Sequence, residues 1–538
     1  MEKLIFKKQK EAIQKTMSAK PLKVLKSKDP RQKAFYASIT SILSSKYIAE
    51  AEAGDLYAIT NNLDIPTINS RTEAWVGNKN GGARGSDVAD KILLEKTNNL
   101  KNIFLTSIDN AYWEAIDNLK EKDSESDGYG EERGFYDFLK KHPSVKHYQT
   151  PKIKIIDKKF ISEIAKEISA EFKRNKKTRT LISLIFEKKD KYMTNSENSE
   201  IYLSDNMLRM YFDIDVLTKK REIMKFVKTI ELSQKYELDN IEDKYDEISR
   251  YAKEIIKQKI SIAEQIANSP WIEHDRYPVI MNGYIHGIYW HEVIGHALEG
   301  DNVLEDGFGA SQSQHIHSVN KLMFPEFITL IDDPTKKNYR GSYEYDDELV
   351  KSKKVLLIEN GIVKDFLHSR KSAGYFNKTS NGHGRAEGTN IPEARMSNLE
   401  LISRKTVNYE DMEKQLVETL KKEKKNYGII FEGEEGSGWT MPDMALHNIV
   451  PETAILINKE GKKSYVKGAY IAGTELVSAS NLLLTADDKK VFSGTCGSAS
   501  GWIPVTSTSP SGLYSKMEIN CFDKSELQKI RKSIIKHT

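Results

Sequence analysis

The chain has 538 residues, a length that predicts two domains rather than one small hydrophobic core. Its 82 basic and 78 acidic residues leave a net charge of only +4, so bulk charge gives no argument for nucleic-acid binding. Two cysteines argue against a disulfide scaffold, no apolar run is long enough to span a membrane, and the first eight residues lack the apolar core of a secretory signal. We therefore expect a cytoplasmic globular protein with no nucleic-acid or membrane partner.

The N-terminal half, residues 1–240, is predicted to be an α+β domain in which helices lie on an antiparallel sheet. The first 50 residues are expected to be helical, strands are expected between residues 47 and 91, and the acidic segment 121–132 is expected to be an exposed, mobile loop. Apolar residues with helical spacing predict a helix from Phe160 to Phe172. Alternating apolar residues then predict strands at 181–186, 201–203, 208–214 and 222–232.

A long amphipathic helix over residues 241–270 is predicted to link the two halves and to act as their hinge. Its apolar side chains recur with helical spacing from Ile241 to Ile266, and Pro270 ends the pattern. Residues 271–538 are predicted to form a β-rich domain whose sheet frames a metal-binding helix. Two hairpins are expected there, with turns at 360–361 and 459–461; the first turn is Asn-Gly, which suits the tight primed geometry.

The strongest chemical signal is the segment from His291 to His296, which reads His-Glu-Val-Ile-Gly-His. Neutral imidazoles are preferred nitrogen ligands of Zn²⁺, and a carboxylate beside the first one, Glu292, can accept a proton from metal-activated water. The segment is typical of a hydrolytic zinc site. A histidine in an apolar run can instead be a hydrogen-bonded core residue, so a third ligand is needed to support a metal site.

The spacing of the two histidines predicts a distorted helix. At about 100° per residue, a position five residues on lies roughly 140° from the starting direction, so a regular helix would aim the two rings apart. A single wide turn, closed by a hydrogen bond to the fifth residue, would realign them. We expect such a bulge or break at residues 294–296, where Gly295 permits the close approach of another backbone.

Cys496 is the candidate for the third ligand. It lies in a segment of small residues, 493–501, which we expect to be a flexible loop able to bend towards an ion. The other cysteine, Cys521, lies in a predicted strand and suits a buried, inert thiol.

The signature segment 291–301 resembles that of the TldD/PmbA family of zinc metallopeptidases, whose pattern is H-E-x-x-x-H. The resemblance covers roughly residue 278 to the C-terminus and includes four further segments: 341–348, 367–373, 381–385 and 494–497. It implies that His291, His296 and Cys496 bind one Zn²⁺ per chain and that Glu292 is the general base. It also implies a dimer, either a homodimer or a pair with a metal-free paralogue, that admits unfolded or extended peptides.

Several residues outside this set are weaker candidates. His383 and Arg385 could bind a substrate carboxylate or polarise a carbonyl, although a structural turn held by the flanking glycines explains them equally well. The acidic residues 346–348 could support the site, but a solvated acidic turn is the favoured interpretation. Three more histidines near the signature could compete as ligands: His286, His315 and His317.

The function predicted from these residues is zinc-dependent hydrolysis of unfolded or extended peptides or of peptide leaders. Residues 473–474 could offer a strand edge to which a peptide pairs through its backbone. Two alternatives remain open: a metallo-hydrolase of a non-peptide amide or ester, and a peptide-binding regulator with a structural metal. A structural zinc normally has four protein ligands, whereas three are credible here, which favours catalysis.

Overall fold

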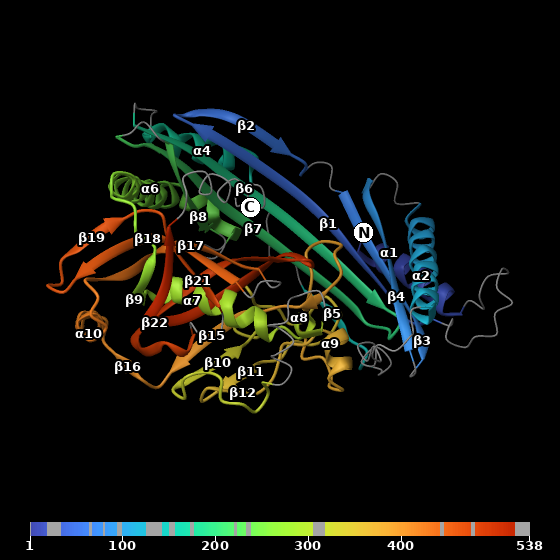
Figure 1. Ribbon diagram of the computed structural model, residues 1–538. Helices are drawn as coiled ribbons and strands as arrows, with labels where there is room; N and C mark the ends of the chain where they lie inside the picture. The colour runs from blue at the N-terminus through green and yellow to red at the C-terminus, as the bar shows by residue number, and fades with distance from the viewer. Residues whose placement is uncertain are drawn as a thin grey trace.

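The computed structural model describes residues 2–18, 34–63, 67–78, 81–93, 99–124, 142–149, 156–172, 177–219, 223–232, 238–304, 318–441, 446–474 and 479–521. Two β-sheets dominate these ranges, one in each half of the chain (Figure 1). The long strands of the N-terminal sheet run diagonally across the view in Figure 1, and the C-terminal sheet lies below them. The fold is therefore α+β, as predicted. No helix within the described ranges is long and apolar enough to cross a membrane.

The N-terminal sheet contains eight strands within the described ranges, and it is antiparallel except where β5 pairs with β7. Its strands are β1 (Ala34–Glu52), β2 (Asp55–Asn61), β3 (Thr67–Asn78), β4 (Gly81–Leu93), β5 (Lys146–Tyr148), β6 (Thr178–Asn195), β7 (Glu200–Leu217) and β8 (Ile223–Glu231). Among the residues that the structure describes, four helices pack on this half: α1 (Glu2–Ser18), α2 (Leu100–Ser124), α4 (Lys158–Glu171) and α6 (Tyr245–Ala267). The predicted helix at 160–172 corresponds to α4, which buries Phe160, Ile161, Ile164 and Ile168. The predicted strands of this half are confirmed, with 201–203 and 208–214 forming parts of the single strand β7.

The prediction of helix for residues 1–50 is wrong beyond residue 33. Residues 34–52 form β1, the central strand between β3 and β6. One face of β1 packs on the helices, since Ala37 and Ile39 share a core with α1 and α2. The other face meets the C-terminal half, where the Arg370 guanidinium lies 4.8 Å from the ring centre of Tyr36. A strand buried on both faces loses the alternation by which strands are recognised in a sequence.

The acidic segment 121–132 is only partly described by the structure. Residues 121–124 end α2, a helix that the sequence did not predict, and residues 125–132 lie outside the described ranges.

The predicted linking helix is present as α6, preceded by a short 3₁₀ turn, η4 (Leu238–Lys244). α6 ends at Ala267, and the side chain of the capping residue Asn268 donates a 2.7 Å hydrogen bond to the Glu264 carbonyl. Its apolar face, including Ile248 and Ile256, belongs to the same core as α4 and the N-terminal strands. We retain the hinge and the boundaries at residues 240 and 270 as proposals.

The C-terminal half is β-rich, and its main sheet contains twelve strands within the described ranges. They are β9 (Asp275–Met281), β10 (Ile328–Asp332), β11 (Val355–Glu359), β12 (Ile362–Val363), β15 (Asn398–Ser403), β16 (Thr406–Val407), β17 (Tyr427–Met441), β18 (Leu446–Asn458), β19 (Lys463–Val466), β20 (Ala469–Thr474), β21 (Leu482–Ser498) and β22 (Gly501–Cys521). A separate two-stranded ribbon is formed by β13 (Gly384–Arg385) and β14 (Glu393–Ala394). The helices of this half include α7 (Gly283–Trp290), α8 (Gly300–Leu304), α9 (Arg370–Tyr375) and α10 (Tyr409–Lys422).

Both predicted hairpins are confirmed. The first joins β11 to β12 through Asn360 and Gly361, whose φ angles are +50° and +76°, as a primed turn requires. The second joins β18 to β19.

Buried ion pairs tie the two halves together. The fully buried Arg370 donates from Nη1 and Nη2 to the two carboxylate oxygens of Glu197, at 3.0 and 3.1 Å. Lys191 of β6 pairs with Asp347 of the C-terminal half. Removing one partner of such a buried pair would leave an uncompensated charge, so these contacts fix the position of the N-terminal sheet over the C-terminal half.

Candidate metal centre

A buried helix delivers the signature segment to the site. β9 ends at Met281, and Asn282 caps the helix α7 (Gly283–Trp290) by accepting a 3.0 Å hydrogen bond from the Ile285 amide. α7 packs against β22, β17 and β21, so the predicted frame of sheet around the helix is confirmed. A Cβ at Gly283 would overlap the Ser509 carbonyl of β22, and this close approach lets the helix lie flat on the sheet.

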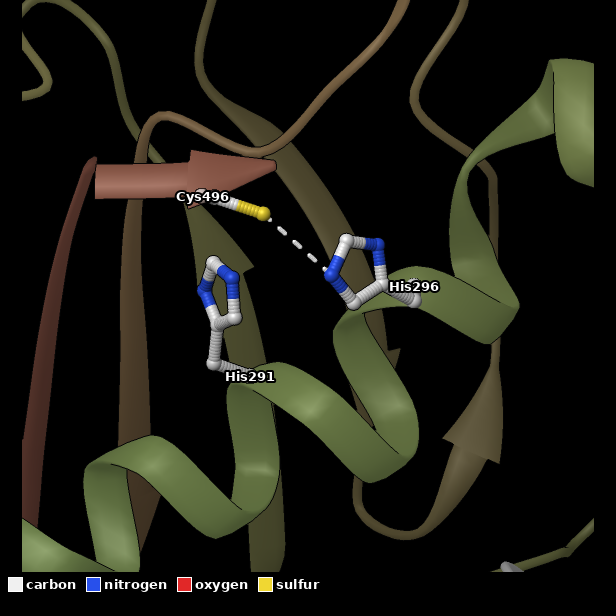
Figure 2. A group of neighbouring side chains, drawn as sticks. All are labelled: His291, His296 and Cys496. Carbon is white, nitrogen blue, oxygen red and sulfur yellow. Dashed lines mark hydrogen bonds between the residues drawn. The ribbon is translucent and has the colours of Figure 1, made fainter. Parts of the chain in front are cut away.

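The predicted distortion of the helix is present as a π-turn, η5 (His291–Gly295). The His296 amide donates to the His291 carbonyl, which is the five-residue hydrogen bond that realigns the two rings. A short 3₁₀ turn, η6 (His296–Leu298), follows. The ring centroids of His291 and His296 lie 5.1 Å apart, and Figure 2 shows both imidazoles pointing to the same side of the helix.

Gly295 permits a close approach, although its neighbour is a side chain and not the backbone that we expected. A Cβ on Gly295 would overlap the sulfur of Met396, a residue that is only 1% exposed.

We expect Gly295→Ala to lower the free energy of unfolding by about 1–3 kcal/mol, because the buried methionine has to be displaced. Denaturant titration measures this change. Gly287→Ala is the matched control: it lies in the same helical segment, and its new methyl carbon would be 3.3 Å from the nearest atom. Equal losses of stability in the two variants would contradict the assigned clash.

Cys496 completes a cluster of three ligand atoms. The sulfur and one nitrogen from each of His291 and His296 all lie within 4.8 Å of one another, and Cys496 Sγ is 3.3 Å from His296 Nε2 (Figure 2). His291 is 2% exposed and Cys496 is 6% exposed. These atoms fit the donor set of a zinc site, since an ion bound among them would have two nitrogen ligands and one sulfur ligand.

The expectation of a flexible loop around Cys496 is wrong. Cys496 lies on β21 and pairs with Ile503 of β22, and the hairpin closes at the pair Ser498–Gly501. The glycines serve close packing here: a Cβ on Gly494 would overlap the ring of Phe492, and one on Gly497 would lie 2.9 Å from the ring of Trp502. A paired strand therefore presents the thiol in a fixed position.

The charges around the cluster favour a cation. Burial alone would raise the pKa of the Cys496 thiol, but His296, Arg395 and His291 hold that pKa well below its usual value. Burial would lower the pKa of His296, yet the Glu299 carboxylate and the Cys496 thiolate raise it well above its usual value. A proton on His296 thus occupies a place where positive charge is stabilised, and binding of a metal ion would displace it.

Glu292 lies beside the cluster without belonging to the ligand set. Its Oε2 is 3.7 Å from His296 Nε2, and its side chain is 14% exposed. Gly438 of β17 packs so closely against it that a Cβ there would overlap the Glu292 Cγ atom. β17 therefore limits the positions that the Glu292 carboxylate can take.

Two residues that the sequence reasoning missed support the ligands. Glu299, which is 1% exposed, accepts a 2.8 Å hydrogen bond at Oε2 from His296 Nδ1. Such a carboxylate fixes the ring orientation of a metal-bound histidine and leaves the other nitrogen for the ion. Arg395, also 1% exposed, donates a 3.0 Å hydrogen bond from Nη2 to Cys496 Sγ. Glu299 follows His296 by three residues, a spacing that could have suggested it, whereas no local pattern points to Arg395.

His383 and Arg385 are buried and hydrogen-bonded within the protein, which argues against a role in binding substrate. His383 Nε2 lies 3.0 Å from Asp332 Oδ1, and both side chains are fully buried. Arg385 donates to the Met396 carbonyl at 2.6 Å and to the Pro504 carbonyl at 2.8 Å. Both residues hold this part of the chain together, which corresponds to the structural alternative.

The other histidines near the signature add no ligand within the described ranges. His286 is fully buried, with Nδ1 2.6 Å from the Pro510 carbonyl and Nε2 2.8 Å from the Tyr514 hydroxyl. His315 and His317 lie outside the described ranges.

The acidic residues 346–348 do not form a solvated turn. Asp346 is 1% exposed and accepts hydrogen bonds from the Val350 and Gly384 amides at 2.8 and 2.9 Å. Burial raises the pKa of Asp346 to about 7 against the effect of these bonds. Glu348 is also buried and accepts a 2.6 Å hydrogen bond from the Arg370 amide. The segment is an internal network beside the contact between the two halves.

Within the described ranges, the strand edge expected at residues 473–474 is paired on one side only, because the pairing of β20 with β22 ends at Ala472. β20 lies between β18 and β22, with Ala469–Ala472 paired to β22 and Gly473 and Thr474 paired to β18.

Comparison with known proteins finds relatives of the C-terminal half and solved structures with the same fold. Residues 274–520 match the family described as the PmbA/TldA metallopeptidase C-terminal domain. A metalloprotease from Methanocaldococcus jannaschii is 34% identical over 230 residues, which is 43% of this chain and 48% of that protein. A zinc metalloprotease TldD homolog from Saccharolobus solfataricus is 35% identical over 124 residues, which is 23% of this chain and 26% of that protein. The chain thus spans about half the length of the first of these relatives.

The crystal structure of TldE from Thermococcus kodakarensis has the same overall fold. The superposition covers 90% of this chain and 96% of that one, with a TM-score of 0.60 and 16% sequence identity. Identity this low supports the shared fold alone, whereas the likeness to a family comes from the match to residues 274–520. The C-terminal half of the chain, residues 274–520, is therefore similar to the C-terminal metallopeptidase domain of the PmbA/TldD family and to curated metalloproteases.

Proposed function

We propose that this chain is a zinc metallopeptidase that hydrolyses unfolded or extended peptides. The observation that carries the proposal is the three-atom cluster of His291, His296 and Cys496. Within the described ranges, no other histidine, cysteine or acidic residue joins this cluster. Three protein ligands are the arrangement of a catalytic zinc ion, which keeps one position for water or substrate.

Each residue of the site has a separate task in this proposal. A bound Zn²⁺ would act as a Lewis acid, lowering the pKa of water and polarising the peptide carbonyl. Glu292 is placed to accept a proton at its carboxylate and to return it to the leaving amine, while Gly438 keeps that carboxylate beside the cluster. Glu299 holds the His296 ring so that Nε2 faces Cys496.

The edge of β17 is the best candidate for binding an extended peptide. β9 pairs with β17 only at Ile429–Phe431, because the chain then leaves the sheet to form α7. From Gly436 to Met441, β18 is the one strand of the described ranges that pairs with β17. Gly438, which touches Glu292, lies in this stretch. A peptide paired here would bind through its backbone, with little demand on its side chains.

The dimer stays a proposal that rests on the family resemblance. Both forms remain candidates, a homodimer and a pair with a metal-free paralogue.

Removal and return of the metal test the proposed function. We expect the purified protein to contain one zinc ion per chain and to cleave unstructured peptides. Treatment with a chelator should abolish cleavage, and one equivalent of Zn²⁺ should restore it, with products separated by mass spectrometry. Cleavage at the full rate by protein shown to be metal-free would refute a zinc peptidase.

The same assay separates the alternatives. A nitrophenyl ester cleaved in preference to every peptide would favour the non-peptide hydrolase. Peptide binding without turnover by zinc-loaded protein would favour the regulator.

A further inference from the structure

The guanidinium of Arg395 lies against the hairpin that carries Cys496, within hydrogen-bond distance of residues near its tip. Nη2 donates to both the carbonyl and the sulfur of Cys496, at 2.9 and 3.0 Å. Nη1 donates to the hydroxyls of Ser498 and Ser500, at 2.6 and 2.8 Å. One rigid, planar group therefore sets the position of the thiol relative to the tip of the β21–β22 hairpin.

Arg395 also faces the residue that orients His296. Its Nε is 3.6 Å from Glu299 Oε1, and both side chains are 1% exposed. The other oxygen of Glu299 accepts the hydrogen bond from His296 Nδ1. A continuous buried chain, His296–Glu299–Arg395–Cys496, thus connects the ligand on the helix with the ligand on the hairpin, although the two are 200 positions apart in the sequence.

We infer that Arg395 is a positioning residue for the metal, which holds the Cys496 sulfur in place and withdraws electron density from it through the N–H···S hydrogen bond. The inference rests on the proposed function, since it assumes that the cluster binds an ion. A thiolate neutralises part of the charge of a metal ion and weakens it as a Lewis acid. A hydrogen bond from a cation to that sulfur reduces the electron density that the sulfur donates to the metal ion, as hydrogen bonds to ligand sulfurs do in other metal sites. Arg395 would thereby restore part of the Lewis acidity that the metal ion loses when a cysteine thiolate binds it.

Arg385 provides a matched control. It is also a buried arginine of this region, and it donates to the Met396 and Pro504 carbonyls, which lie beside Arg395 and on β22. Its loss should disturb the packing of the same segments without removing the hydrogen bond to the Cys496 sulfur.

The experiment uses Co²⁺ as a spectroscopic probe in the full chain. Cobalt bound to a thiolate shows a sulfur-to-metal charge-transfer band in the near ultraviolet. In Arg395→Gln the sulfur becomes a stronger donor, so this band should move to longer wavelength. Because the sulfur also loses the group that holds it in place, the affinity for Zn²⁺ should fall by about 10–100-fold, as measured in competition with a chromophoric chelator. Arg385→Gln should leave the band where it is in the parent protein. In Arg395→Lys, which keeps a cationic donor, the band should lie between its position in Arg395→Gln and its position in the parent protein.

The outcomes distinguish this inference from the function on which it rests. A parent protein that binds no cobalt, or binds it without the charge-transfer band, would remove the proposed zinc site itself. An unmoved band in Arg395→Gln, or the same shift in Arg385→Gln, would overturn the role of Arg395 while leaving the site intact. If circular dichroism shows that Arg395→Gln does not fold, the band of Arg395→Lys decides. A single ammonium donor should still shift this band relative to the parent protein. An unmoved band would contradict the inference.

Discussion

Replacing Glu292 with glutamine is expected to reduce peptide hydrolysis by about 10²–10⁴-fold while the zinc content stays at the parental level. Glutamine has nearly the same shape as glutamate but cannot accept a proton under these conditions. Glu292 lies beside the ligand atoms and outside the ligand set, so its loss should not release the ion. The measurement pairs kcat/KM for an unstructured peptide with zinc analysis of the same preparation.

Glu359→Gln is the control for this variant. Glu359 is an exposed residue next to the β11–β12 turn, far from the signature in sequence and outside the ligand cluster. It should retain parental activity. Unchanged turnover in Glu292→Gln would remove this residue from the mechanism, and loss of zinc would show that it is needed to bind the ion.

Cys496→Ala is expected to weaken zinc binding by about 10²–10³-fold. Structural zinc sites with four ligands bind their ion with roughly 10–16 kcal/mol, so one ligand contributes on the order of 3–4 kcal/mol. The change also leaves Arg395 facing Glu299 without the sulfur that accepts its hydrogen bond. Competition with a chelator of known affinity measures the effect.

The second cysteine gives a matched control for that measurement. Cys521 is a half-buried thiol at the end of β22 and lies outside the ligand cluster. Cys521→Ala should bind zinc as tightly as the parent protein. Equal affinities in Cys496→Ala and the parent would show that the thiol is not a ligand.

The part of the site that follows from local sequence could be predicted. Two histidines five residues apart can face one ion only if the helix is distorted, and the π-turn at His291–Gly295 confirms that argument. The asparagine-glycine hairpin and the long helix α6 are equally local, because turn chemistry and apolar spacing determine them. These features can be predicted without knowing which other parts of the chain pack against them.

The features that depend on distant contacts could not be predicted. β1 was expected to be helical because its apolar and polar residues do not alternate as they do in a half-exposed strand. Helices bury one face of β1, and the C-terminal half buries the other. For His383 and Arg385 the sequence left a substrate role and a structural turn equally open, and only the fold shows that they lie in the interior with Asp332 and Pro504.

The support of Cys496 was likewise beyond local reasoning. Glycines beside a thiol predicted flexibility, whereas in the structure they make room for the aromatic rings of Phe492 and Trp502 within a paired hairpin. Arg395 approaches the sulfur from a segment 101 positions away. The pairing of β21 with β22, the ribbon β13–β14 and the pairing of β15 with β22 bring it there.

X-ray absorption at the zinc edge of the purified chain tests most directly whether two imidazoles and one thiolate bind a single ion. The geometry of the cluster predicts one sulfur neighbour at about 2.3 Å and two imidazole nitrogens at about 2.0–2.1 Å, with a remaining light neighbour from water. A spectrum without a sulfur neighbour, or with four protein ligands and no water, would contradict a catalytic zinc ion at His291, His296 and Cys496.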